Sequence, residues 1–395
     1  MTILRVFLYL TLIIIGVERV NAQQTSLRIY GIIDIGLQWQ KIDLGGSRPD
    51  AIASQRIGLA SGVESGSRWG LRGEEKLNED LRAVFVLENG FDATNGTASQ
   101  GGRLFGRQST LGLQSERLGQ LDFGRQTNMA TKFFLAMDPF SQGFGQANMG
   151  TSFGSTNTVR YSNMVLFQTP SINGLKAGAG YSFDTQASQL YVDHPGASSS
   201  ANETTDFPTM NNPRAITLGV TYSGGPLMLS ASYDQAMGNV SIPGGAPASA
   251  PRAWVVGGLY HFQQVKISAA YGQSSGGAFF GQVPGTSAVG GTGKFTVTGG
   301  SDMLFDQNFR NRSYLVGVTA PVGGSGTMFG SWQMMQPVGE WGGQATANQQ
   351  ILSIGYSYAF TARTDLYTYV SYAKNYAMVR DTSSSMAGAG WRHRF

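Results

Sequence analysis

The stretch LKAGAGYSFD, residues 175–184, alternates strictly between two kinds of side chain. Its odd-numbered positions carry leucine, alanine, tyrosine and phenylalanine, whereas its even-numbered positions carry lysine, glycine, serine and aspartate. Successive side chains of a β-strand point to opposite faces, so this segment predicts a strand with one apolar face and one polar or very small face.

The same period of two recurs along the chain. A soluble β-sandwich also alternates in this way. Three features favour a membrane barrel: segments of ~9–11 residues, aromatic residues near segment ends, and polar faces rich in glycine, serine and arginine. The clearest further segments are 215–222, 227–234, 265–272, 352–360 and 387–395.

The connections between these segments alternate between short and long. The short ones are 74–80, 116–119, 168–173, 224–225, 263–264, 321–325 and 363–364. The long ones are 42–61, 92–102, 128–155, 185–213, 237–251, 274–309, 337–348 and 377–385. Seven short and eight long connections separate sixteen strands and put both chain ends on the short-turn side. We therefore expect an all-β fold, a 16-stranded antiparallel transmembrane β-barrel with short periplasmic turns and long extracellular loops.

The composition excludes several other classes of protein. The chain has 395 residues, of which 55 are glycine and none is cysteine, and its formal net charge is +4. Without cysteine, a disulfide scaffold and a thiolate metal site are impossible. Charged residues make up 13% of the chain and aromatic residues 11%. That combination argues against intrinsic disorder, which needs high charge and few aromatic residues.

Residues 1–22 resemble a secretory signal peptide. Arg5 precedes an apolar run over 6–17, and the segment ends at Ala22 with a small residue suited to cleavage. The alternative, a membrane anchor, needs ~20 apolar residues. We expect export from the cytoplasm, with the mature chain 23–395 forming a single barrel.

Several charged residues fall on the polar faces of the expected strands. Arg68 precedes Trp69, and Arg160 lies between Val159 and Tyr161. A charge on the lipid face costs ~2–4 kcal/mol at mid-bilayer, so these side chains are expected to point into the barrel. The charged residues that alternation directs inward are Arg68, Arg72, Arg82, Glu88 and Arg160.

The segment 103–114 alternates less cleanly. The face that holds Arg107 also holds Leu111 and Leu113, whereas the other face holds Gln108 and glycines. A polar face of this kind suits contact with another subunit. A register displaced by one residue explains the pattern equally well, and both interpretations stay open.

Five motifs and the chain end resemble the general porins of Gram-negative bacteria, in particular the betaproteobacterial type found in Bordetella, Burkholderia and Neisseria. The motifs are SRWGLRGEE (67–75), FVLENGF (85–91), RLFGRQ (103–108), LGQLDFGRQ (118–126) and VRYS (159–162). The terminal GWRHRF, with Trp391 and Phe395, resembles the family's signal for barrel assembly.

The resemblance implies a trimeric barrel whose third long loop, here 128–155, folds inward and narrows the pore. The stretch FFLAMDPF (133–140) is too apolar for an ordinary outer loop, which agrees with packing against an inner wall. The basic residues that match the family's pore constriction are Arg68, Arg107 and Arg160.

Four further residues belong to the expected constriction. Glu88 and Asp138 are the acidic counterparts, although the family often has glutamate in a different local motif at the position of Asp138. Arg82 and Arg125, like Arg72, either face the pore or form structural ion pairs with a carboxylate of a turn or of the barrel wall. An excess of arginine in a narrow pore raises the local concentration of anions, so we expect a modest anion preference.

The expected function is passive diffusion of small hydrophilic solutes and ions across the outer membrane of a Gram-negative bacterium. The expected partners are two further copies of the chain, outer-membrane lipid and lipopolysaccharide, and the assembly machinery that reads the last strand. We expect no nucleic-acid partner, no cofactor and no metal, because His194, His261 and His393 lack a second ligand at metal spacing. An enzymatic barrel, an adhesin or phage receptor, and a substrate-specific channel are the alternatives.

Overall fold

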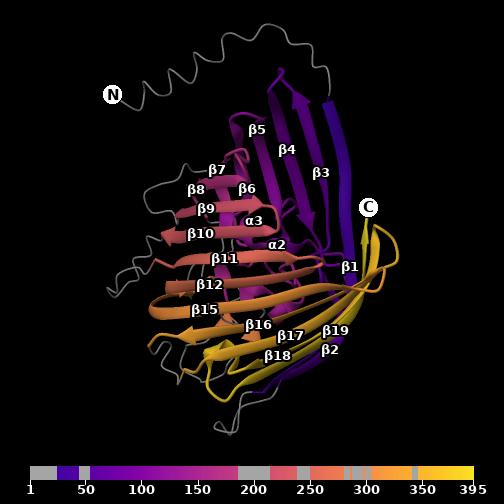
Figure 1. Ribbon diagram of the computed structural model, residues 1–395, viewed down its shortest axis with the longest axis vertical. Helices are drawn as coiled ribbons and strands as arrows, with labels where there is room; N and C mark the ends of the chain where they lie inside the picture. Colours follow the sequence, from indigo (N-terminus) through magenta and orange to yellow (C-terminus); the bar gives the residue numbers. More distant parts are fainter. Residues whose placement is uncertain are drawn as a thin grey trace.

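The computed structural model describes residues 25–43, 54–185, 214–237, 250–279, 285–286, 297–298, 304–339 and 346–395. The predicted signal peptide 1–22 and large parts of the expected outer loops lie outside these residues. Figure 1 shows the strands wrapped into one barrel, with the C-terminus beside β1.

The first half of the barrel comprises β1 to β9. Their bounds are Thr25–Asp43 (β1), Ser54–Ser61 (β2), Arg68–Lys76 (β3), Leu81–Gly90 (β4), Gln108–Ser115 (β5), Gly119–Thr127 (β6), Arg160–Gln168 (β7), Leu175–Ser182 (β8) and Arg214–Gly224 (β9).

The second half follows with Leu227–Met237 (β10), Arg252–Phe262 (β11), Val265–Ala278 (β12), Leu304–Val322 (β15), Gly326–Pro337 (β16), Gln349–Ala359 (β17), Thr364–Lys374 (β18) and Ser383–Arg394 (β19). A separate two-stranded ladder pairs Gly285–Thr286 (β13) with Val297–Thr298 (β14). Short helices are Ser99–Gly102 (α2), Met129–Phe134 (α3), Gly145–Ala147 (η2), Met149–Thr151 (η3), Gly154–Thr156 (η4) and Tyr376–Met378 (η5).

The barrel closes between its first and last strands. β1 pairs antiparallel with β19 in a register that runs from Ile32 opposite Arg394 to Asp43 opposite Ser383. Phe395 continues this ladder, since its N–H donates to the carbonyl of Gly31 at 3.0 Å and its carbonyl accepts from the N–H of the same residue at 3.1 Å. Closure leaves no unpaired sheet edge along this seam.

β2 and β3 are two parts of one barrel strand. Both pair with β1, β2 along its second half up to Ile42 and β3 along its first half up to Ile32. The 17 hydrogen-bonded segments of the large sheet therefore form 16 strands, which confirms the predicted barrel. The expected long connection 42–61 was too long, because its last eight residues form β2.

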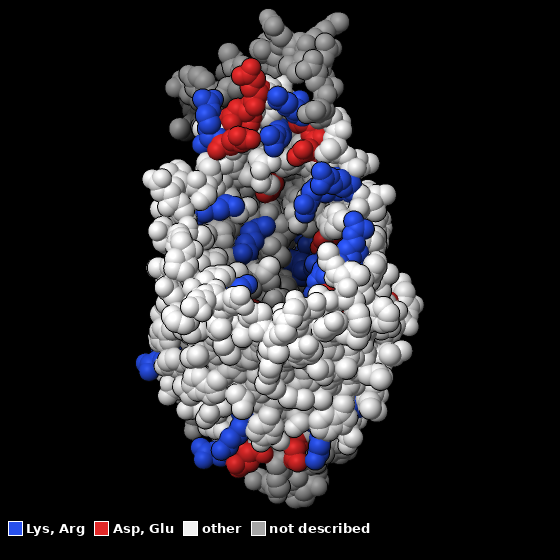
Figure 2. All heavy atoms as spheres, turned by 45° about the vertical axis from the view of Figure 1, so that its right-hand side comes forward, with Lys and Arg blue, Asp and Glu red and all other residues white. Residues whose placement is uncertain are grey.

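The two faces of the wall differ as alternation predicts. On β18, Leu366, Val370 and Tyr372 are exposed on the outside, whereas Tyr369 and Ser371 are buried inside. The outer wall in Figure 2 is almost free of charged side chains, and lysines and arginines gather around the opening into the barrel. No helix in the part of the chain that the structure describes is long and apolar enough to cross a membrane.

β5 resolves the ambiguity over residues 103–114. Leu111 and Leu113 are exposed on the outer face, whereas Gln108 and Gln114 line a cavity inside the barrel. The polar face is thus the lumen face and does not indicate a subunit contact. Arg107 lies just before β5, so strand alternation does not govern its side chain.

Candidate pore constriction

The segment 128–155 lies inside the barrel and is tied down at its root. The side chain of Asn128 caps α3 by accepting from the N–H of Thr131 at 3.1 Å. Its amide nitrogen donates to the carbonyl of Ser155 and to Asp234 Oδ1, both at 2.8 Å. One buried asparagine therefore joins the two ends of the loop to each other and to β10.

Apolar packing holds the first part of the loop against the inner wall. α3 contacts β8, β9 and β10, and its residues Met129, Phe133 and Phe134 are almost fully buried. The wall leaves room for them because glycine faces them: a Cβ at Gly219 would lie 2.9 Å from atoms of both Met129 and Phe133. A Cβ at Gly317 would likewise collide with the loop.

The tip of the loop packs against the opposite wall. Phe144 lies with its ring centre 5.4 Å from Phe329, 5.4 Å from Tyr367 and 5.1 Å from Tyr369. Its N–H donates to the carbonyl of Val63 at 2.5 Å.

Hydrogen bonds from the wall hold the rest of the loop. Gln333 donates to the carbonyl of Ala147 at 2.8 Å, and Ser313 donates to that of Ser152 at 2.6 Å. With α3 on β8–β10 and the tip on β16–β18, the loop spans the interior of the barrel.

Asp138 is buried within this loop and does not join the arginines. Its carboxylate accepts from the N–H groups of Phe140 at 3.0 Å, Gln142 at 2.8 Å and Met149 at 3.0 Å. Burial raises the pKa of Asp138 to about 6, and the three backbone hydrogen bonds oppose that rise. Asp138 is 2% exposed, and its carboxylate joins three main-chain N–H groups of the same loop.

Arg68, Arg107 and Glu88 are brought together on the wall. Glu88 Oε1 lies 2.7 Å from Arg107 Nε, and Glu88 Oε2 lies 3.7 Å from Arg68 Nε. The hydroxyl of Tyr30 donates to Glu88 Oε2 at 2.9 Å. The phenol thus comes from β1, one cation from β3 and the carboxylate from β4. The segment before β5 supplies the second cation.

Two more arginines lie beside this group and bond to main-chain oxygens. Arg160 Nε donates to the carbonyl of Arg107 at 3.0 Å. Arg125 Nε donates to the carbonyl of Gly106 at 2.7 Å, and its Nη1 donates to Ser162 Oγ at 2.9 Å. Arg160 is 8% exposed and Arg125 is 7% exposed, so solvent contact within the cluster falls mainly to Arg68 and Arg107.

Arg82 lies elsewhere, at the short-turn rim. Its Nη2 is 3.2 Å from Glu116 Oε1, and both side chains are well exposed. Arg82 could either face the pore or form an ion pair with a carboxylate, and in the structure it forms an ion pair with the turn residue Glu116.

A further charged cluster, which sequence reasoning missed, lies at the seam. Arg392 Nη2 is 2.8 Å from Glu64 Oε1 and 3.0 Å from Asp365 Oδ2. Arg394 Nη1 is 2.8 Å from the same Asp365 oxygen. Glu64 lies in the break between β2 and β3, so the interruption brings a carboxylate to the terminal strand. No alternation pattern in the sequence marks this contact.

Trp391 and Phe395, the residues of the expected assembly signal, are exposed on the terminal strand at 56% and 47%. Within the residues that the structure describes, there is no cluster of three or more histidine, aspartate or glutamate side chains that could hold a metal.

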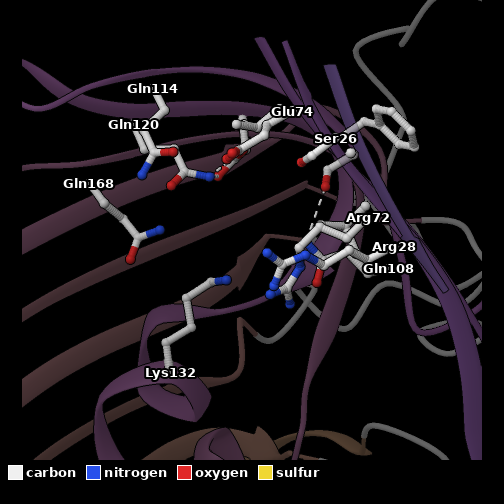
Figure 3. A pocket seen from close by; sticks show the side chains of 15 residues that line it. Ser26, Arg28, Arg72, Glu74, Gln108, Gln114, Gln120, Lys132 and Gln168 are labelled. Carbon is white, nitrogen blue, oxygen red and sulfur yellow. Dashed lines mark hydrogen bonds between the residues drawn. The ribbon is translucent and has the colours of Figure 1, made fainter. Parts of the chain in front are cut away.

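A cavity of about 490 Å³ lies on the short-turn side of the arginine cluster, since Ser26, Arg28, Arg72 and Glu74 line it. Figure 3 shows the side chains around it. Arg28, Arg72 and Lys132 are its cationic residues. Sequence reasoning directed Arg72 inward but overlooked Arg28, whose position between Leu27 and Ile29 carries the same alternation signal.

The comparisons with known proteins agree with this geometry. A family model described as Gram-negative porin matches residues 19–377. The chain is 44% identical to an outer membrane porin protein of Bordetella pertussis, over 94% of this chain and 95% of that protein. It is 28% identical to outer membrane porin protein 32 of Delftia acidovorans, over 89% of this chain and 85% of that protein.

Solved structures share the fold at low sequence identity. An anion-selective porin from Comamonas acidovorans superposes with a TM-score of 0.66 at 22% identity, covering 94% of this chain and all of that one. The outer membrane channel DcaP of Acinetobacter baumannii gives 0.62 at 14% identity, covering 96% of this chain and 99% of that one.

Proposed function

The chain belongs to the Gram-negative porin family, and from this premise we propose that it is a diffusion channel with a modest preference for anions. Family membership confirms the resemblance seen in the sequence. It also locates the protein in the outer membrane of a Gram-negative bacterium.

The arrangement of Arg68, Arg107 and Glu88 is the observation that supports anion preference. The guanidinium groups of Arg68 and Arg107 share one carboxylate. The guanidinium group of Arg160 lies beside them, bonded to the carbonyl of Arg107. Charge in a narrow, partly desolvated passage raises the local concentration of the opposite ion. The inward-folded segment 128–155 supports a narrow passage at this level.

We propose that the protein transports and does not catalyse. A hydrolytic barrel would need an activated nucleophile with its base. The ring nitrogen Nδ1 of His393 lies 2.9 Å from Thr364 Oγ1 across the β18–β19 ladder, a structural position. His261 lies next to the short turn 263–264, and His194 lies outside the described residues.

The proposed assembly is a homotrimer embedded in lipid and lipopolysaccharide, delivered by the machinery that reads Trp391 and Phe395. An OmpT trimer from Vibrio cholerae has the same fold, with a TM-score of 0.60 at 15% identity.

A trimer is expected to migrate as a large species on unheated detergent gels and to collapse to the single chain after boiling. A single-chain band in both lanes would contradict it.

Zero-current potentials in planar bilayers under a potassium chloride gradient test the anion preference. We expect the sign of an anion-selective channel for the unmodified protein. The double variant Arg68→Gln/Arg107→Gln should move the potential towards cations, whereas Arg82→Gln at the rim should leave it nearly unchanged. A cation-selective unmodified channel overturns the proposal.

A further inference from the structure

The cavity on the short-turn side of the arginine cluster, which we call the chamber, is lined by residues of the barrel wall and of the inward loop. Arg72 follows Arg68 by four residues on β3, which corresponds to about 13 Å along an extended strand. The volume of the cavity, about 490 Å³, falls within the range of small-molecule sites. Besides its cations, the cavity is lined by four glutamines, Gln108, Gln114, Gln120 and Gln168.

Arg28 and Arg72 form an unusual pair. They lie directly opposite each other in the β1–β3 ladder, and both side chains line the cavity. Like charges in this position destabilise a sheet. In the described part of the chain neither guanidinium lies within 4.0 Å of a carboxylate oxygen. Arg72 instead lies over the ring of Tyr30, 5.4 Å from its centre.

Lys132 adds a third cation from the opposite side. It belongs to α3 of the inward loop, and Figure 3 shows its side chain reaching into the cavity towards the two arginines. A ligand between these groups would therefore be held by the wall and by the loop together.

Hydrogen-bonding groups line the remainder of the cavity together with Gly73, Val84, Phe85 and Val86. Two carboxylates, Glu74 and Asp122, line it together with the glutamines. Gln120 Nε2 donates to both oxygens of Asp122, at 2.9 and 3.0 Å. In Figure 3, Glu74, Gln114 and Gln120 lie apart from the arginines. The cavity thus has a cationic end and an end rich in acceptors and amides.

We propose that this chamber binds small polyhydroxylated carboxylates of the sugar-acid type. The carboxylate lies between Arg28 and Arg72, each of which presents a planar fork suited to two hydrogen bonds. The hydroxyl groups donate to Glu74 and Asp122 and exchange hydrogen bonds with the glutamines. A polyanion fits less well, because its second charge would face these carboxylates. The inference rests on the proposed function, since a solute reaches the chamber only through an open channel.

Single-channel recording in potassium chloride with added gluconate tests this site. Gluconate is expected to interrupt the chloride current of the unmodified channel in a concentration-dependent way. Acetate has the charge without the hydroxyl groups and sorbitol has the hydroxyl groups without the charge, so both should interrupt it far less. In Arg28→Gln/Arg72→Gln the apparent affinity for gluconate should fall about tenfold or more.

Two further variants make the result specific. Arg82→Gln/Arg117→Gln removes two positive charges at the short-turn end, where both arginines pair with turn carboxylates. It should keep the affinity within about twofold, which is well under 1 kcal/mol. Arg28→Lys/Arg72→Lys keeps the charge but lacks the planar fork, so an intermediate affinity is expected.

Four results would overturn the proposal: no interruption by gluconate, equal interruption by acetate or sorbitol, unchanged affinity in the glutamine double variant, or full affinity in the lysine double variant. Every variant is recorded as an inserted, conducting channel, which excludes misfolding as the cause. The anion preference is tested separately, by the zero-current potential measured without gluconate. A cation-selective sign there would overturn the proposed function and not the binding site.

Discussion

The carboxylate of Glu88 interacts with three side chains, those of Arg68, Arg107 and Tyr30. At this residue scale the balance of charge beside Arg68 and Arg107 depends on this carboxylate, which contacts both guanidinium groups. Its side chain is 15% exposed, so its charge faces a partly desolvated surrounding.

Glu88→Gln removes that charge and leaves the two guanidinium groups uncompensated. We expect the zero-current potential to move further towards anions, because the net positive charge of the narrow region rises by one. Glu116→Gln, which removes a carboxylate from the exposed rim, is the matched control and should have little effect. An unchanged potential in the Glu88→Gln channel would show that this group does not face the ion path, and a shift towards cations would contradict the charge argument.

Asp138 leads to a prediction about pH. Burial raises its pKa to about 6, above the usual value near 4, so the docked loop binds more protons than a released loop between these two values. By linkage, docking becomes more favourable as the pH falls from about 6 towards 4 and changes no further below 4. Open-channel current noise should therefore be lower at pH 5 than at pH 7.5, and Asp138→Asn should abolish the difference. Higher noise at pH 5 in the unmodified channel would contradict this sign.

At the scale of elements, the inward loop and the glycines of the wall fit each other. A Cβ at Gly317 would meet the ring of Pro139 and Ser268 Oγ, so valine at this position should displace the loop from the wall. Overpacking of this kind costs about 1–3 kcal/mol.

We expect Gly317→Val to increase single-channel conductance, since the displaced loop fills less of the lumen. Gly58→Val provides the control. Gly58 lies between the outward-facing Ile57 and Leu59 on β2, and nothing lies within 4 Å of a Cβ there. Equal conductance in both variants would show that the loop does not set the size of the pore.

At the scale of the whole molecule, the seam between first and last strands is reinforced inside the barrel. Arg392 of the terminal strand lies between Glu64 and Asp365, and its side chain is 13% exposed. Removing one partner of a buried ion pair costs about 3–5 kcal/mol, because the remaining charges stay buried without compensation.

Arg392→Met should therefore lower the thermal midpoint of the barrel, measured by the loss of β-sheet circular dichroism in detergent. Arg394 also contacts Asp365, but its side chain is 37% exposed. Arg394→Met should therefore lower the thermal midpoint much less. Equal midpoints for the two variants would show that the Glu64 contact contributes nothing to closure.

The sequence by itself determined the barrel and the side of the wall on which most residues lie. Side chains of successive strand residues point to opposite faces of the wall. The apolar and polar faces, the number of strands and the inward direction of Arg68, Glu88 and Arg160 therefore follow from local pattern. The same rule failed where the chain leaves regular strand geometry: at Arg107 before β5, and at the break between β2 and β3.

Only the tertiary structure decided which charged groups meet. Strand register and the path of the inward loop bring Arg68 and Arg107 to one carboxylate, bury Asp138 against backbone N–H groups, leave Arg82 at the rim and set Arg28 opposite Arg72. Apart from the hydrogen bonds of Asp138 within its own loop, these contacts join residues that lie far apart along the chain, so the local pattern carries no information about their distance in space. They depend on how all sixteen strands are staggered when the barrel closes.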